Sequence, residues 1–547
     1  MPERLRDCLA LGAALAIGAA AFLAFCGWWV LLPSNIAWLA SGDRAMHQLG
    51  WMFYRAAPWG WPPGASPLLG IELSSSIALV DGLPLLAIPA KLLSPWLPEP
   101  FQYWGCWLLL SFMLQAGFAY AVARELAAGR RVALFAAAFA VITPAFLFRV
   151  PLHMALSGHF VLIAGLYLYL RRRPPALWMW PLLAGATAAI HATLLAMVLA
   201  LWVAALVMRG GRRALAEIPM VLGATLLVLH LVGFFGVGSY AASGYGDYKL
   251  NLAWPLLTYG WSVLLPDLPH TRLDYEGLSF PGIGILALLA IALLSGAVPR
   301  AAQRRWLPLA LVLAGLVLFA VSKSPSIGPF DLGTLPVPSL VETIGEAFRS
   351  TGRFVWPLLY LMTIGAVVLV GRRWRPRLAL PLLAVLFAAQ LLDSAPAWHK
   401  FKAHLPAPAA VWPTPLTSPF WARAAAAGYD RLRAIPNETG FGSDFAAPGY
   451  YAVTHGMDTD IAYLGRLDPA AEAALAATKA AQLDTGAFEP RTLYLLDVPA
   501  ALAVMAHLAP GDLLATIDGR IVFARGGAPL VADLGIDPMP AMGGRGG

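Results

Sequence analysis

The run "CLALGAALAIGAAAFLAFCGWWVLL", residues 8–32, decides the fold class of this chain. It carries no charged residue and exceeds the roughly 20 apolar residues that a helix needs to cross the hydrocarbon core of a bilayer. Of the 547 residues, 59% are hydrophobic and only 12% are charged, which is too apolar for a soluble globular protein. The sequence therefore predicts a polytopic membrane protein built mainly from α-helices.

Arginine-rich short loops set the predicted topology. They separate the apolar runs in the pattern of the positive-inside rule, which places such loops in the cytoplasm. With all of them inside, an odd number of crossings leaves the N-terminus in the cytoplasm and sends the C-terminal part outside. The eleven expected crossings are residues 8–32, 103–124, 131–149, 156–170, 177–190, 193–208, 215–236, 281–298, 307–322, 354–371 and 378–395.

The charge distribution argues against nucleic acid as a partner. Residues 396–547 hold 11 Lys and Arg against 14 Asp and Glu, which leaves a net charge of +11 for residues 1–395 out of the chain's +8. The positive charge thus belongs to the membrane loops. The three cysteines, Cys8, Cys26 and Cys106, lie in apolar segments without CxxC spacing, so neither a disulfide framework nor a zinc site is indicated.

Three parts are expected along the chain. Residues 1–395 form the membrane module, with its first outer loop at 33–102, residues 396–420 a proline-rich linker, and residues 421–547 a small α/β domain in the periplasm. Within the first outer loop, residues 74–98 are apolar but carry two charges and several prolines. We interpret this segment as broken helices lying in the outer interface, and a tight hairpin is the alternative.

An amphipathic helix is expected in the first outer loop. Between Arg44 and Arg55, one helical face is apolar and the opposite face carries His47, Gln48 and Trp51, a pattern typical of a helix lying flat on a membrane. Asp43 stands directly before this helix. It has two interpretations, a helix cap whose carboxylate accepts backbone N–H bonds, or a functional acid at the outer face.

Several short motifs carry a resemblance to a known superfamily. They are "GDRAMHQLGW" (42–51), "DGLPLLAIPAK" (81–91), "FQYWGCW" (101–107), "DYEGLSFPGIG" (274–284), "FRSTGRFVWPL" (348–358) and "IAYLGRLD" (461–468). Together they resemble a bacterial branch of the GT-C superfamily of integral-membrane glycosyltransferases. The resemblance covers essentially the whole chain.

The resemblance implies transfer of a sugar from a polyprenyl-phosphate-linked donor at the outer membrane face, with an acid of the first outer loop as base or metal ligand. By this carry-over Asp43 is the catalytic candidate. The motif "GD" holds one acid where metal-dependent relatives have a pair, so no metal is assigned and a divalent metal remains the alternative. No other cofactor is expected.

Departure of a lipid phosphate requires positive charge. Arg353 is the first candidate for the donor phosphate and Arg349 the second, because both stand at the outer mouth of a span, where this chain otherwise avoids arginine. Four residues apart, they share one helical face if a helix begins there. Arginines that merely extend to the interface are the alternative.

The remaining candidates contact substrate in the expected scheme. In the loop 244–282, Lys249 and Glu276 stand among aromatic residues that fit either a sugar ring or an interfacial aromatic belt. His153 and His159 are six residues apart, which is not a helical metal spacing, and buried histidines are the default interpretation. In the first outer loop, His47 stands one turn from Asp43, and Glu72 and Asp81 are reserve acids.

The expected function is therefore glycosyl transfer to an envelope glycan, lipid or protein in the inner membrane of a bacterium. The alternatives are a non-enzymatic flippase or exporter of a lipid-linked glycan and a scaffold for envelope-polymer assembly. The predicted spans contain almost no ionisable residue apart from His191 and His230, and a transporter normally holds its cargo with polar groups near the bilayer midplane.

Overall fold

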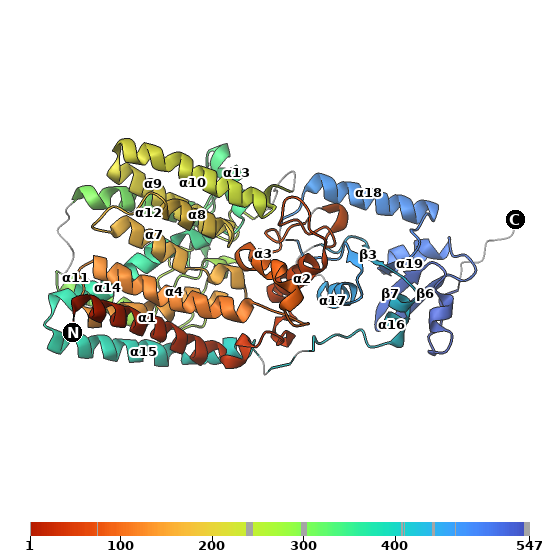
Figure 1. Ribbon diagram of the computed structural model, residues 1–547, viewed down its shortest axis with the longest axis horizontal. Helices are drawn as coiled ribbons and strands as arrows, with labels where there is room; N and C mark the ends of the chain where they lie inside the picture. The colour runs from red at the N-terminus through yellow and green to blue at the C-terminus, as the bar shows by residue number, and fades with distance from the viewer. Residues whose placement is uncertain are drawn as a thin grey trace. The chain divides into compact units, whose positions relative to one another are not determined.

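The computed structural model describes residues 2–73, 75–236, 244–296, 303–405, 408–409, 411–439, 444–464 and 466–540. The chain forms two compact units (Figure 1). The membrane unit comprises residues 1–38, 100–228 and 242–408, and the sheet unit comprises residues 39–99, 229–241 and 409–547. Each unit is thus assembled from three separate stretches of the chain.

Apolar helices make up the membrane unit. Seven segments of the described chain are long and apolar enough to cross a membrane, namely Glu3–Cys26, Trp104–Glu125, Arg130–Arg149, Ala192–Arg209, Gly211–Leu231, Thr351–Arg373 and Pro376–Lys402. The expectation of a mainly helical membrane protein is confirmed. The other four expected crossings coincide with shorter helices, so the count of eleven stays a prediction. The helices are α1 (Glu3–Cys26), α4 (Trp104–Glu125), α5 (Arg130–Val141), α6 (Pro144–Arg149), α7 (Phe160–Leu170), α8 (Met179–Ala188), α9 (Ala192–Arg209), α10 (Gly211–Leu231), α11 (Ile283–Leu294), α12 (Gln303–Val321), α13 (Ser339–Phe348), α14 (Trp356–Arg373) and α15 (Pro376–Lys402).

The basic loops of the membrane unit meet at one end of its helices. Arg130 donates to Asp7 at 2.7 Å, next to the N-terminus. The backbone N–H of Arg172 donates to Glu125 at 3.1 Å, and Arg372 donates to a backbone carbonyl just after α4, also at 3.1 Å. The N-terminus and the loops after α4, α7 and α14 therefore lie at the same end of the membrane unit. A common side of a membrane requires this arrangement. That this side is the cytoplasm stays a prediction.

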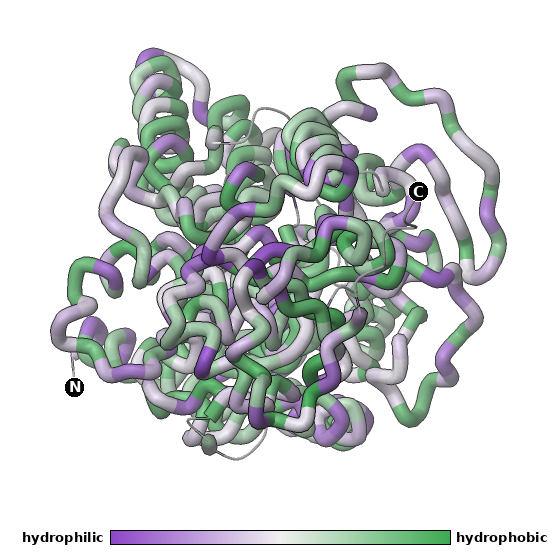
Figure 2. The backbone as a smooth tube through the Cα atoms, turned by 90° about the vertical axis from the view of Figure 1, so that its right-hand side faces the viewer, coloured by the Kyte–Doolittle hydropathy of each residue, from purple (hydrophilic) through white to green (hydrophobic). Residues whose placement is uncertain are grey.

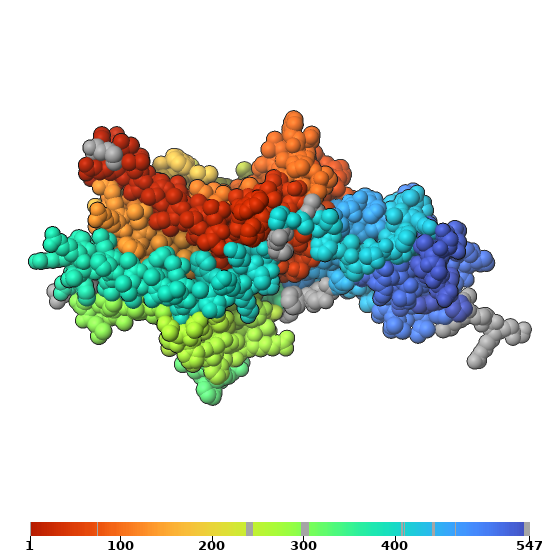
Figure 3. All heavy atoms as spheres, turned by 90° about the horizontal axis from the view of Figure 1, so that it is seen from below, coloured from red at the N-terminus to blue at the C-terminus, as the bar shows by residue number. Residues whose placement is uncertain are grey.

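A glycine lets α1 and α4 pack closely. A Cβ atom added at Gly18 would lie 2.4 Å from the carbonyl oxygen of Phe112, too close for any real contact. Beside it, the rings of Phe22 and Phe112 meet edge to face with centroids 5.9 Å apart. On another side α1 lies along α15, where Phe25 meets Trp398 (Figure 3). Close backbone approach between small residues is how helices associate in lipid.

The sheet unit contains a five-stranded sheet in the order β4-β3-β5-β7-β6. β3 pairs in parallel with β4 and β5, whereas β7 pairs antiparallel with β5 and β6. The small α/β domain expected in the C-terminal part is present, and Asp468 caps α18 ahead of Pro469 as the sequence predicts. The elements are β3 (Arg431–Ile435), β4 (Asp458–Thr459), β5 (Thr492–Leu496), β6 (Leu513–Ile517), β7 (Arg520–Ala524), α16 (Pro419–Ala426), α17 (Ala446–Thr454), α18 (Pro469–Thr485) and α19 (Val498–Met505).

Hydrophobic residues of this sheet form a compact core. The rings of Phe488, Tyr494 and Phe523 pack together, with Tyr494 and Phe523 completely buried. Hydrophilic and hydrophobic residues are mixed along the segments that face the viewer in Figure 2. None of the described helices α16 to α19 is long and apolar enough to cross a membrane.

The first outer loop joins the sheet unit. It contains α2 (Asp43–Ala56) and α3 (Pro84–Leu92). Nine residues of α3 reach only about 14 Å, so this segment does not cross a bilayer as helix. The position of α2 in the outer interface stays a prediction. Within the sheet unit, α2 packs against α17.

We predict that Gly18→Ala lowers the stability of the purified protein by about 1–3 kcal/mol, because the new methyl group must separate α1 from the α4 backbone. Thermal unfolding in detergent measures the effect. Gly12→Ala is the matched control on the same helix, since no described atom lies within 4 Å of a Cβ at Gly12. Equal melting temperatures for the two variants would contradict the close α1–α4 contact.

Candidate functional site

Arg149, Glu276 and Arg353 form a buried charge cluster in the membrane unit, here called the arginine trio. Arg149 Nη1 donates to Glu276 Oε2 at 2.9 Å, and Arg353 donates to the same oxygen through Nη2 at 2.5 Å and Nε at 3.1 Å. Arg149 also donates to the backbone carbonyl of Glu276 at 2.7 Å. The side chains are 3%, 15% and 10% exposed respectively, so the trio is largely withdrawn from solvent.

Two glycines bring the trio together. Glu276 lies in the 3-10 helix Asp274–Gly277 and Arg353 in the 3-10 helix Thr351–Val355. A Cβ added at Gly352 would lie 2.8 Å from the Cα of Gly277 and 2.7 Å from the carbonyl oxygen of Lys249. Only residues without a side chain permit this approach. The motifs "EG" and "TGR" therefore specify the contact between two segments that are far apart in sequence.

The electrostatics of the trio favour an anion. Burial raises the pKa of the Glu276 carboxyl, but the charges of Arg149 and Arg353 outweigh burial and hold that pKa well below its ordinary value. Glu276 is therefore a carboxylate at neutral pH. Two guanidinium groups share one carboxylate, so the trio carries a formal charge of +1. A buried surplus of positive charge is a binding place for phosphate or carboxylate.

Aromatic side chains surround the guanidinium of Arg149. Its carbon lies 4.8 Å from the ring centroid of Phe148 and 5.6 Å from that of Trp356. Trp356 also packs on His159, with centroids 4.0 Å apart, and His159 Nδ1 lies 2.6 Å from the hydroxyl oxygen of Tyr360. His159 is completely buried, and its proposed contact with substrate stays a prediction.

Arg349 and Arg353 do not share a helical face. α13 ends at Phe348, Arg349 follows in the left-handed region at φ 58°, and α14 begins only at Trp356. The guanidinium of Arg349 lies over the Tyr248 ring at 4.9 Å and donates to its hydroxyl at 3.0 Å. The spacing of four residues is thus not a helical pair, because the chain turns sharply between α13 and the next 3-10 helix.

The other candidates of the membrane unit have defined surroundings. Lys249 is buried and pairs with Asp331 at 2.8 Å. His153 is half-buried, and its ring lies 5.5 Å from that of His191, edge to face. His191 itself caps α9 by accepting from a backbone N–H, which places it at a helix end. Glu276 joins the trio, whereas its proposed contact with a sugar stays a prediction.

Asp43 belongs to the sheet unit and is the first residue of α2. Gly42, at φ 59°, occupies the cap position, so Asp43 stands in the first turn instead of serving as the helix cap. Next to it, burial lowers the pKa of Arg44 to about 10 although the charge of Asp43 acts in the opposite direction. Asp43 is half-buried, which leaves its carboxylate a candidate base.

The other loop candidates divide into two groups. His47, one turn beyond Asp43, and Asp81 approach so that their ligand atoms lie within 4.8 Å of one another. These two residues are where a divalent metal would find protein ligands in this unit, the rest of its coordination coming from water or phosphate oxygen. Glu72 instead pairs with Arg433 of β3 at 2.5 Å.

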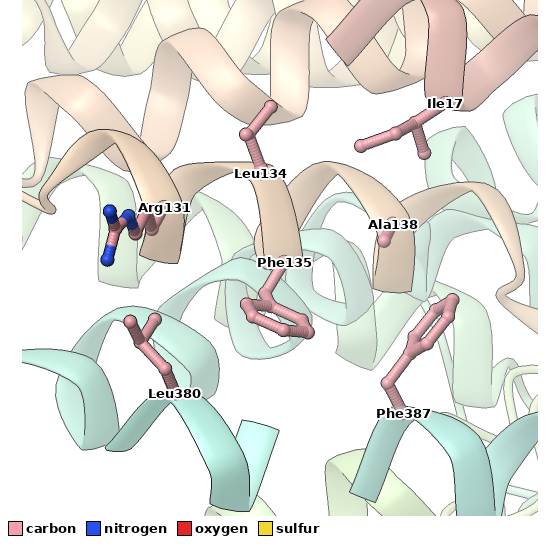
Figure 4. A pocket seen from close by; sticks show the side chains of 7 residues that line it. All are labelled: Ile17, Arg131, Leu134, Phe135, Ala138, Leu380 and Phe387. Carbon is pink, nitrogen blue, oxygen red and sulfur yellow. The ribbon is translucent and has the colours of Figure 1, made fainter. Parts of the chain in front are cut away.

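An apolar crevice opens between α1, α5 and α15 of the membrane unit. It has a volume of about 360 Å³ and is lined by Ile17, Arg131, Leu134, Phe135, Ala138, Leu380 and Phe387. Figure 4 shows the rings of Phe135 and Phe387 on either side and Arg131 at one end. None of the predicted site residues lines it. Its walls fit hydrocarbon chains, as a lipid-facing surface requires.

Two residues of these clusters escaped the sequence interpretation. Arg149 ends a predicted span on the side opposite to the basic loops. The same position singles out Arg353, so this signal is also present for Arg149. Arg433 lies in a short strand of an ordinary α/β domain and carries no local signal. Its pairing with a residue 361 positions earlier in the chain becomes visible only in three dimensions.

Comparison with known proteins gives the family. Residues 15–395 match the model described as "Domain of unknown function (DUF6311)", and residues 420–525 match "DUF6311 C-terminal domain". The chain belongs to this family. No curated protein matches it.

One similar solved structure is that of the arabinofuranosyltransferase AftD from mycobacteria, determined by single-particle cryo-electron microscopy. The two chains are 16% identical, with a TM-score of 0.47. The similarity covers 80% of this chain, which spans about 30% of the length of that enzyme.

We predict that Glu276→Gln destabilises the protein by about 3–5 kcal/mol at pH 7, because two buried guanidinium groups lose their shared carboxylate. Thermal unfolding measures the loss. Asp533→Asn is the matched control, since the side chains of Asp533 and its partner Arg423 are 72% and 38% exposed and such a surface pair contributes little to stability.

The pH dependence of this difference follows from the depressed pKa of Glu276. A depressed folded-state pKa contributes stability that is complete above the ordinary value of 4.5 and is lost as pH falls through the folded-state value. The difference in melting temperature between wild type and Glu276→Gln is therefore constant above about pH 5 and narrows in more acidic buffer. A difference that widens on acidification would contradict the assignment.

Proposed function

We propose that this chain is a glycosyltransferase that takes a sugar from a polyprenyl-phosphate-linked donor and transfers it to an envelope glycan, lipid or protein. The observation that carries the proposal is the arginine trio, a buried site with surplus positive charge at the end of apolar helices. An anionic head group on a hydrocarbon chain matches both properties. The proposal agrees with the motifs that resemble GT-C enzymes.

The arginines are assigned to the donor phosphate. Arg353 is the first candidate, and Arg149 joins it because both guanidinium groups are held by the same carboxylate. Glu276 fixes their planes, so little rotamer entropy is lost when a phosphate binds. Arg349, stacked on Tyr248, is the second-rank phosphate candidate. As the bond to the sugar breaks, negative charge grows on the departing phosphate and these cations stabilise it.

Asp43 is assigned as the general base. The acceptor hydroxyl gives its proton to the Asp43 carboxylate while its oxygen forms a bond to the anomeric carbon, and the bond from that carbon to the phosphate oxygen breaks. The leaving group is the polyprenyl phosphate. A single displacement of this kind inverts the anomeric configuration.

The proposed location follows from the positive-inside pattern. The N-terminus and the basic loops lie in the cytoplasm, and the first outer loop and the C-terminal domain lie in the periplasm of a bacterial inner membrane. Lipid-linked donor and acceptor are then both on the outer face. Cysteine labelling of position 43 in intact cells tests this placement, and labelling only after permeabilisation of the inner membrane would reject it.

We predict that Asp43→Asn reduces transfer from undecaprenyl-phosphate-linked hexose or pentose by about 10²- to 10⁴-fold, because the amide cannot accept the proton. Product formation by the purified protein in liposomes measures the rate, and thermal unfolding verifies folding. Glu99→Gln is the control, since Glu99 lies in the same loop with a 72% exposed carboxylate. Undiminished transfer by Asp43→Asn would reject the role of this residue.

Mass spectrometry of envelope glycans with and without the gene tests the function as a whole. Loss of one monosaccharide from a defined glycan names the donor and the acceptor together. An unchanged glycan profile, combined with no transfer from either class of donor by the wild-type protein, would reject the proposed function.

A further inference from the structure

The segment that carries Asp43 is bound into the C-terminal domain. Residues 68–70 extend the edge of the sheet, where Leu69 forms a parallel bridge with Thr459 of β4. The Gly70 N–H donates to the Thr459 carbonyl at 2.8 Å, and the Thr459 N–H donates to the Leu68 carbonyl at 3.0 Å. An exposed sheet edge is thereby paired with a stretch of chain that lies roughly 390 residues earlier.

An ion pair joins this added strand to the sheet. Glu72, directly after the bridge, accepts from Arg433 through both carboxylate oxygens, at 2.5 and 3.2 Å. The Arg433 side chain is only 4% exposed and also lies 3.5 Å from Asp460 and 3.4 Å from Glu489. A bidentate guanidinium–carboxylate pair fixes direction as well as distance. Glu72 is therefore held by the interior of the C-terminal sheet.

A second, independent contact holds α2 itself. α17 of the C-terminal domain packs against α2, and a Cβ added at Gly449 would lie 3.0 Å from the Leu49 side chain. Leu49 lies less than two turns beyond Asp43 on the same helix. The C-terminal domain thus contacts the loop at two places, at α2 and at residues 68–72.

We propose that Arg433 and Glu72 are positioning residues, through which the C-terminal domain fixes the segment that carries the candidate base Asp43. Glu72 is then not a substrate-binding acid, and the C-terminal domain is a structural support for the site. The consequence for activity rests on the proposed function, whereas the ordering of residues 68–72 does not.

Hydrogen exchange of the full-length protein tests the ordering. In Glu72→Ala, the amides of Gly70 and Thr459 are expected to exchange at least roughly tenfold faster, because a charge-assisted double hydrogen bond is lost. In this variant Arg433 retains its ion pairs with Asp460 and Glu489, so we expect the sheet to stay folded. Glu99→Ala is the matched control, whose surface pair with Arg55 lies in the same loop. Unchanged exchange at both amides in Glu72→Ala would overturn the proposal.

Kinetics distinguish positioning from substrate binding. Positioning predicts that Glu72→Ala lowers kcat about tenfold or more with the donor KM unchanged, and that Glu72→Asp, which keeps the carboxylate, restores part of the rate. Faster exchange with an unaltered kcat, or a raised KM with unaltered exchange, would overturn the positioning role. If the wild-type protein transfers no sugar, the proposed function fails, and exchange at Gly70 and Thr459 still decides whether the pair holds the segment.

Discussion

The membrane unit depends on one carboxylate shared by two buried arginines. Removing three charged groups from water costs several kcal/mol for each, and the mutual attraction of the groups offsets this only when their hydrogen bonds are nearly ideal. Here Arg149, Glu276 and Arg353 make four hydrogen bonds within 3.1 Å. They join the end of α6, the loop before α11 and the 3-10 helix that precedes α14. Because an unpaired charge at this buried place would be costly, the contact fixes one arrangement of these segments. The two guanidinium groups and one carboxylate together keep a formal charge of +1.

The sheet unit shows a different constraint, the need to complete a sheet edge. β4 has only two residues, and its backbone groups find partners in residues 68–70 of the first outer loop. The chain therefore leaves the first span, builds α2 and α3, and returns for ten further predicted crossings before the sheet that accepts this loop is made. Such a non-local pairing orders the loop only after the C-terminal domain has folded.

Local patterns account for what the sequence could predict. Apolar length predicts the helices, and charge placement singles out Arg353 as a candidate. Other features depend on distant partners. Glu276 pairs with residues 127 positions before it and 77 after it, and Glu72 pairs with Arg433, 361 positions later. The sequence of α2 predicts an amphipathic helix, but not its packing against α17. The predicted helical face shared by Arg349 and Arg353 is wrong for a local reason. Nothing in "FRSTGRF" indicates the left-handed turn at Arg349 that separates it from the next helix.

The position of charge along the helices favours the proposed enzyme over a transporter. Among the described residues of the membrane unit, the buried charged or histidine side chains lie in loops or toward helix ends, namely Arg149, His159, His191, Glu217, Lys249, Asp274, Arg353 and Asp393. Near the middle of α4 and α14 the buried polar groups are the uncharged Gln115 and Thr363. Cargo passing through the bilayer needs compensating groups at its centre. Chemistry on a lipid head group needs them only at one end, where the arginine trio lies.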